Sequence, residues 1–236
     1  MLYFCPSKFY NMKLTLREKL VLLFHHELKD RFSVNDYRFD TAFAGAILFE
    51  LIALKQLEIS KHKLVAIGSA KGLSKDLKEV YKLIEKNEKH KKVCYWVAYI
   101  SERAKNFRNA TLKQMAKEGL LSVEIKRSFL FFTKETTHLH DSSIRQEIFQ
   151  DLRAVLLDGK KPSFDELALI CLIDSADVYR LISNVKGECP KMKEKFKALV
   201  GEDVAGQGVT EAVEMVNSAV FTALYSDAGS SSCMVE

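Results

Sequence analysis

Proline and glycine are scarce in this sequence, with three prolines and ten glycines among 236 residues. Chains built from many short strands need more of both residues at their turns, so this composition favours long helices. The sequence also lacks any run of the roughly 20 apolar residues that a transmembrane helix requires. Any membrane contact is therefore expected to be peripheral.

Cysteine is sparse as well, with residues at positions 5, 94, 171, 189 and 233. Their number is odd, no two form a C-x-x-C pair, and the first residues lack the cationic segment and apolar run of a secretory signal. We therefore expect free thiols in a reducing, cytoplasmic compartment.

The charge balance is mild, because 36 basic and 31 acidic residues give a formal net charge of +5. Such a small and mixed excess does not fit a dedicated nucleic-acid binder. It is compatible with contact between the protein and an anionic surface.

Apolar residues recur at helical spacing through most of the chain, which predicts a mainly α protein. We expect one large helical domain over residues 13–226, an N-terminal extension at 1–12 and a disordered tail at 227–236, with both Met1 and Met12 as candidate starts. Residues 39–59, "FDTAFAGAILFELIALKQLEI", are apolar on nearly every side, so this helix should be buried at the centre. Thr15 and Glu18 form a capping-box pattern at the start of an earlier helix.

Two short segments predict β-hairpins. Residues 57–68 alternate around "SKHK", and residues 120–134 read "LLSVEIKRSFLFFTK". In the second segment we expect a polar tip at 126–128 and a second strand that includes residues 129–132. An isolated ribbon is marginally stable, so its apolar residues should pack either on the protein's own helices or on another subunit. The lysine-rich helix at 74–92 is interpreted as a solvated face.

Sequence patterns for catalysis or metal binding are weak. Adjacent His25 and His26 point about 100° apart on a helix, and the H-E-x-x-H motif is missing. His138 and His140 share a strand face without a third ligand nearby, and no phosphate-cradling glycine loop or G-x-S-x-G elbow is present. Asp174 and Asp177 lie in an apolar helix, where structural pairing is the favoured interpretation. We expect no metal, no cofactor and no enzymatic activity.

Four tracts occur in a characteristic order: "LTLREKLVLLFHHEL", "FAGAILFELIALKQLEI", "KNFRNATLKQMAKEGLLSVEIKRSFLFFTKETTHL" and "LRAVLLDGKKPSFDELALICLIDSADVYRLI". Over residues 14–185 the chain resembles the Golgi phosphoprotein 3 family. The resemblance implies a helical domain with one protruding β-hairpin. It also implies a peripheral Golgi membrane protein that binds phosphatidylinositol 4-phosphate and grips the cytoplasmic tails of glycosyltransferases.

The resemblance further implies a headgroup pocket. The family pattern R-N-x-R corresponds here to "KNFR", which supplies Lys105 and Arg108. Arg108 could grip phosphate oxygens with its forked guanidinium, whereas Lys105 would act as a point charge. Neighbouring Arg103 and Arg38 complete the expected set of headgroup-binding residues. The family's tryptophan has no counterpart, and its further arginine falls on or near Ala44.

Our leading hypothesis is a non-enzymatic peripheral adaptor that binds anionic phospholipid headgroups and carries protein tails as cargo. The hairpin is expected to mediate self-association and to lean its tip towards lipid, through Val123, Ile125, Lys126, Arg127, Phe129 and Phe131. The alternatives are a soluble interaction scaffold that has lost lipid binding, and an enzyme acting on a phosphorylated small molecule. The expected location is the cytosolic face of the Golgi in a eukaryote, or the cytoplasm or inner-membrane surface in a bacterium.

Overall fold

The computed structural model describes residues 13–26, 29–127, 133–201 and 207–225. Within these ranges the chain is mainly helical, with two antiparallel β-hairpins, so the predicted fold class is confirmed. The helices are α1 (Leu16–Phe24), α2 (Asp36–Ala53), α3 (Lys75–Glu85), α4 (Val93–Ser101), α5 (Ala104–Lys117), α6 (Ser143–Leu157), α7 (Phe164–Ser175), α8 (Glu188–Gly201) and α9 (Gln207–Tyr225), with a short 3-10 helix, η2, at Tyr179–Leu181. The hairpins are β1 (Leu57–Ser60) with β2 (Lys63–Ala66), and β3 (Leu121–Arg127) with β4 (Thr133–Leu139).

Helix α2 is the central helix, as its apolar sequence predicts. Its middle residues are fully buried, and it contacts α1, α4, α5, α7 and α9. Gly45 permits two of these helices to approach closely, because a Cβ there would lie 2.7 Å from Leu172 of α7 and 2.9 Å from Val220 of α9. Burial on all sides requires small residues where neighbouring helices approach closely.

Several helix starts follow from local sequence. Thr15 and Glu18 form a reciprocal capping box at α1, and Ser163 and Glu166 form another at α7. Such caps satisfy backbone N–H groups that the first helical turn leaves unpaired. The α5 helix ends before Gly119, whose φ of +79° suits a C-terminal cap.

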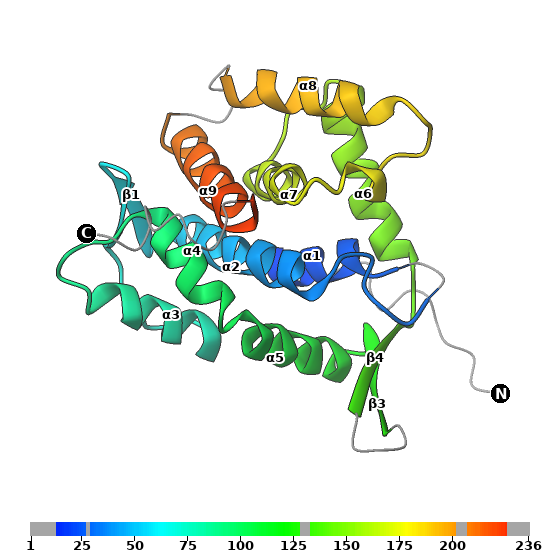
Figure 1. Cartoon of the computed structure of the whole chain (residues 1–236), viewed down its shortest axis with the longest axis horizontal. Helices are drawn as coiled ribbons and strands as arrows, with labels where there is room; N and C mark the ends of the chain where they lie inside the picture. The colour runs from blue at the N-terminus through cyan, green and yellow to red at the C-terminus, as the bar shows by residue number, and fades with distance from the viewer. Residues whose placement is uncertain (1–12, 27–28, 128–132, 202–206, 226–236) are drawn as a thin grey trace.

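The elements distribute unevenly around α2 (Figure 1). Helices α3 and α5 lie along one edge of the view, with the β3–β4 hairpin projecting below α5. Helix α8 lies along the opposite edge, beyond α7 and α9. This arrangement makes α3, α5 and the hairpin one side of the molecule.

The β3–β4 hairpin forms as expected, but the expected tip at residues 126–128 is wrong. The backbone register pairs Lys126 with Lys134 and Arg127 with Thr133, so both basic residues belong to β3. Two-residue turns favour Gly, Asn or Asp, and none of these occurs in residues 123–134, so the sequence carried no strong turn signal at 126–128. Phe129 and Phe131, which we assigned to the second strand, lie outside the described residues.

Candidate anion-binding surface

The junction between α4 and α5 carries three of the four predicted headgroup residues. Helix α4 ends at Ser101, and α5 begins at Ala104 after Arg103. Lys105 and Arg108 are three residues apart on α5, so they lie on neighbouring positions of one helix face. Their surroundings nevertheless differ, because Lys105 is exposed and Arg108 is buried.

Arg108 is held by two carboxylates from the start of α2. Its Nη2 donates to Asp36 Oδ1 at 3.2 Å, and its Nη1 lies 3.1 Å from Asp40 Oδ1. The guanidinium carbon also lies 4.8 Å from the ring centre of Phe39. The side chain of Arg108 is only 7% exposed. The cation that the sequence predicts as the main headgroup ligand is thus neutralised internally.

The environment of Asp40 reflects this crowding of charges. Burial raises the pKa of Asp40 above its ordinary value; Arg108 and Lys105 oppose the rise, and Asp36 adds to it. Two carboxylates and two cations therefore meet at one place, and their formal charges cancel. A neutral cluster is a poor receptor for a phosphate dianion.

Arg103 faces a different part of the surface. Its Nη1 donates to the carbonyl of Tyr99 at 3.0 Å, and its guanidinium carbon lies 3.9 Å from that ring's centre. Arg103 lines a groove of about 420 Å³ together with Lys75, Asp76, Glu79, Asn106, Phe107 and Ala110. Both charge signs are present in this groove, so it does not select clearly for an anion.

Arg38 is directed to the other side of α2. Its Nη1 donates to the carbonyl of Ala176 at 2.6 Å, at the end of α7, and its guanidinium carbon lies 5.5 Å from the ring centre of Tyr225 in α9. The structure therefore brings Lys105 and Arg108 together but leaves Arg103 and Arg38 in separate surroundings.

Helix α3 presents a stripe of lysines that the sequence interpretation treated as a solvated face. The stripe consists of exposed Lys75, Lys78, Lys82 and Lys86, at helical spacing. The opposite face of the helix is buried through Leu77, Val80, Tyr81 and Ile84. The spacing was visible in the sequence, but only the fold shows that this helix lies on the same side as α5 (Figure 1).

The positive charge of the chain is concentrated in residues 61–127, a stretch that includes α3 and α5. Residues 61–127 contain 17 of the 36 basic residues but only seven of the 31 acidic residues. The rest of the chain therefore carries more acidic than basic residues, although the protein as a whole is basic. In α5, Lys113 and Lys117 are exposed along with Lys105. The excess comes from α5 and from the segments on either side of α3, because the three lysines within α3 are matched by Asp76, Glu79 and Glu85. We call the side formed by α3, α5 and the hairpin the cationic side of the molecule.

The base of the β3–β4 hairpin is fixed to α1 by His25. Its Nε2 lies 2.8 Å from the carbonyl of Thr137 in β4, and its Nδ1 lies 2.9 Å from the carbonyl of His26. Burial lowers the pKa of His25, although both carbonyls favour the protonated ring. Val123 is partly buried against the core, which is the first of the two alternatives expected for the apolar residues of the ribbon.

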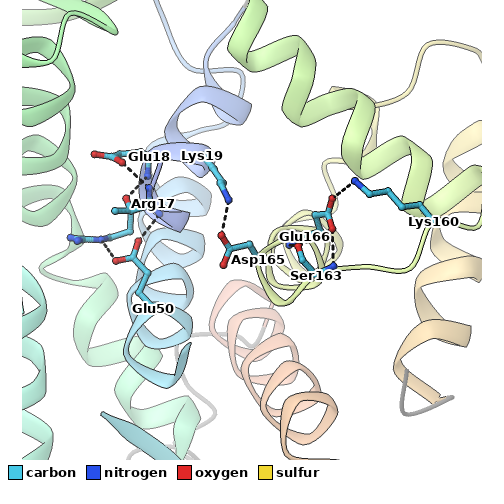
Figure 2. Close-up of polar contacts among 9 residues, drawn as sticks. Arg17, Glu18, Lys19, Glu50, Lys160, Ser163, Asp165 and Glu166 are labelled. Atoms are coloured by element: carbon cyan, nitrogen blue, oxygen red, sulfur yellow. Dashed lines mark hydrogen bonds and ion pairs between the residues drawn. The ribbon is translucent and has the colours of Figure 1, made fainter. Parts of the chain in front are cut away.

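A second cavity of about 420 Å³ lies where α1, α3 and α7 begin, next to the end of α2. Figure 2 shows Arg17 and Glu50 pointing toward each other there, with Arg17 Nε 3.0 Å from Glu50 Oε2. Lys19 pairs with Asp165 at 2.6 Å beside them. Because each of these charges already has an opposite partner, the cavity offers no obvious acid or base for catalysis.

The other polar residues considered from sequence have structural partners. Asp174 accepts from the Tyr179 hydroxyl at 3.0 Å and from Asn217, and Asp177 pairs with Lys193 at 2.6 Å. The described residues contain no group of three or more His, Cys, Asp or Glu side chains placed to hold a metal ion. None of the described helices combines the length and apolar character needed to cross a bilayer.

Sequence reasoning missed the two residues that most affect the predicted pocket, Asp36 and Asp40. They are four residues apart at the start of α2, which places both on one helix face. That spacing was a usable signal for a paired acidic site, but nothing local indicates that its partner lies on α5.

Comparison with known proteins is informative at the family level. A family model described as Golgi phosphoprotein 3 (GPP34) matches residues 16–216. A search of curated proteins finds no match.

Proposed function

Because this chain belongs to the Golgi phosphoprotein 3 (GPP34) family, we propose that it is a non-enzymatic peripheral membrane adaptor. Its lipid target is an anionic phospholipid surface, with phosphatidylinositol 4-phosphate as the lipid that the family resemblance suggests. Its cargo is the tail of a membrane protein. Its place is the cytosolic face of the Golgi, or the inner-membrane surface if the organism is bacterial.

The observation that carries this proposal is the concentration of positive charge on the α3–α5 side. Helices α3 and α5 lie along one edge of the view in Figure 1, and seven exposed lysines belong to them or directly follow them: Lys75, Lys78, Lys82, Lys86, Lys105, Lys113 and Lys117. Each basic residue close to an anionic leaflet contributes about 1 kcal/mol. Three or four lysines at the surface would give weak attachment that falls as salt rises.

Stable residence on a membrane then requires a second contribution, and the hairpin is our candidate for it. Self-association through the ribbon would link several cationic surfaces and raise the overall avidity without any new lipid contact. Ile125, Phe129 and Phe131 are the proposed apolar contacts, and Lys126 with Arg127 the proposed basic ones, whereas Val123 packs against the protein's own core.

We further propose that charge, rather than a fitted headgroup pocket, dominates lipid binding. Arg108 is neutralised by Asp36 and Asp40, and Arg103 and Arg38 lie elsewhere, which leaves Lys105 as the exposed cation of the predicted pocket. Vesicles that contain phosphatidylserine should therefore compete well with vesicles that contain phosphatidylinositol 4-phosphate at equal total charge.

Vesicle sedimentation tests the proposal directly. A Lys78→Gln/Lys82→Gln/Lys86→Gln variant removes three charges from the α3 stripe while preserving its buried face. We expect about a hundredfold weaker binding to phosphatidylserine vesicles, the product of three losses of about 1 kcal/mol. Neutral phosphatidylcholine vesicles should bind neither protein.

A matched control is available on α8, at the opposite edge of the molecule in Figure 1. The variant Lys191→Gln/Lys195→Gln/Lys197→Gln makes the same change in net charge on that helix. It should bind vesicles within about threefold of the wild type, because most of its removed charges lie beyond a Debye length of about 8 Å from the membrane. Equal losses in both variants would contradict a cationic side and leave only net charge.

The second candidate is a soluble interaction scaffold of the same fold. The neutral cluster around Arg108 favours it, together with the missing tryptophan of the family pocket. It predicts that the wild type fails to sediment with anionic vesicles even at low salt. That result would replace the adaptor proposal with the scaffold.

A further inference from the structure

We propose that Asp36 is a displaceable internal occupant of the Arg108 site, which a phosphate group must replace before it can bind there. The inference rests on the proposed function, because it concerns how the cationic side selects its ligands. Under this proposal Asp36 determines specificity: it keeps Arg108 closed to weakly held anions.

The two carboxylates around Arg108 differ in how firmly they are held. The Asp36 side chain is 79% exposed and touches Arg108 through one hydrogen bond of 3.2 Å, whereas the Asp40 side chain is only 16% exposed. An exposed ion pair is weak and exchanges readily with solvent. Asp40 therefore serves as the lasting counter-charge, and Asp36 is the group that can leave.

Arg108 also has unused hydrogen-bonding capacity. A guanidinium carries five N–H donors, and here Nε and Nη1 are buried without a hydrogen-bond partner of good geometry. A buried donor without a partner is unfavourable, so the side chain is poised to accept another oxygen ligand. A phosphate group that takes the place of the Asp36 carboxylate would bind Nη2 with one oxygen, and its other oxygens would be available to the remaining donors.

The surroundings of the site favour an anion once Asp36 has moved away. Asp36 is the first residue of α2, so its carboxylate lies at the positive end of an 18-residue helix. Lys105 is exposed nearby and favours the ionised form of Asp40. Without the charge of Asp36, the cluster of Asp40, Lys105 and Arg108 has a formal charge of +1 instead of zero.

The test compares Asp36→Asn with Glu194→Gln, which removes the same charge from an exposed position on α8. Inorganic phosphate is titrated into each full-length protein, and NMR shifts of the Arg108 side chain and the neighbouring amides report binding. We expect Asp36→Asn to bind phosphate about fivefold more tightly than the wild type, the effect of one nearby charge. Glu194→Gln should not change the affinity.

A double variant identifies the residue that binds the anion. Asp36→Asn/Arg108→Lys keeps the charge but loses the fork of donors, so the gain in affinity should disappear. If that protein folds poorly, Asp36→Asn/Lys105→Gln distinguishes the two cations: a phosphate gain that survives the loss of exposed Lys105 assigns the anion to Arg108, and a gain that is lost assigns it to Lys105 and overturns the proposal. The proposal is overturned if Asp36→Asn binds phosphate no better than wild type, or if Glu194→Gln gains equally.

Vesicles separate this inference from the proposed function. In one outcome, the wild type and Asp36→Asn bind anionic vesicles with equal affinity, and Asp36→Asn has no higher affinity for phosphate. That outcome overturns the role of Asp36 and leaves the adaptor function standing. A phosphate gain in Asp36→Asn, with no vesicle binding by either protein, supports the role of Asp36 but shows that its ligand is a free phosphate compound. A gain with both phosphate and vesicles supports the two proposals together.

Discussion

Replacement of Arg17 by methionine should expose how strongly the α1–α2 contact depends on a buried ion pair. Arg17 Nε lies 3.0 Å from Glu50 Oε2, and the two side chains are only 7% and 10% exposed (Figure 2). The backbone N–H of residue 17 donates to Glu50 Oε1 at 2.8 Å and would remain after the substitution. Methionine keeps much of the aliphatic volume of arginine, so the variant chiefly removes the charge.

The magnitude follows from the burial of the carboxylate that is left behind. At 3.0 Å and an effective dielectric constant of about 20, two unit charges attract by about 5 kcal/mol. Part of this lost attraction is offset, because burying Arg17 in the wild type costs hydration free energy and the methionine variant has no such cost. Breaking one partner of a buried pair typically costs about 3–5 kcal/mol. The interaction of Arg17 with Asp76 at 3.4 Å adds to the loss, so we expect at least about 3 kcal/mol.

The expected loss depends on pH with a definite sign. Burial already raises the pKa of Glu50, and Arg17 opposes that rise. In the Arg17→Met variant, the pKa of Glu50 in the folded protein rises further above its value in the unfolded chain. The variant therefore retains stability at low pH and loses it as pH rises through the pKa of Glu50 in the folded state. The stability gap between wild type and variant should therefore be smaller at about pH 5 than at about pH 8.

Urea unfolding at both pH values measures this gap, provided the transition is two-state. The control is Lys19→Met on the same helix, which breaks a partly exposed pair with Asp165 and should cost about 0.2–1 kcal/mol at either pH. An Arg17→Met loss below about 1 kcal/mol, or one that does not change with pH, would refute the reasoning.

Three further predictions concern other parts of the fold. Gly45→Val should lower the free energy of unfolding, measured by urea titration, by about 3 kcal/mol, because the valine side chain would overlap Leu172. Unchanged stability would mean that α2 and α7 can move apart at this position. His62→Gly should raise the melting temperature with a gain of about 1 kcal/mol, because the φ of His62 is +63° in the two-residue β1–β2 turn; a loss would show that its contact with Met215 matters more. Burial lowers the pKa of His25, so the unfolded ring takes up a proton first and stability should fall as pH drops below about 6.5. His25→Gln should flatten this part of the profile of melting temperature against pH. An equally steep profile in the variant would assign the pH dependence to other groups.

Much of the fold could be predicted because its signals are local. The capping box of Thr15 and Glu18, the C-cap at Gly119 and the buried sequence of α2 each depend on residues within a few positions of one another. A hairpin was predicted within residues 120–134 and forms between strands 121–127 and 133–139, but the predicted turn at 126–128 was wrong. A turn position without Gly, Asn or Asp carries too weak a preference to fix the register from sequence.

The candidate site could be predicted only in part. The "KNFR" motif correctly placed Lys105 and Arg108 side by side on α5, and the family resemblance made them candidates for an anion site. What they contact was beyond local reasoning. Arg103 contacts Tyr99, and Arg38 contacts the end of α7, because the surrounding helices determine which cations can meet.

The sequence by itself determined where the helices begin, which of them is buried, and that residues 61–127 carry an excess of positive charge. These properties depend on composition and on periodicity over one or two helical turns. Only the tertiary structure decided that Arg108 is neutralised by Asp36, a residue 72 positions earlier in the chain. The physical reason is that a charge responds to whatever lies within a few ångströms, and the packing of α2 against α5 selects that neighbour.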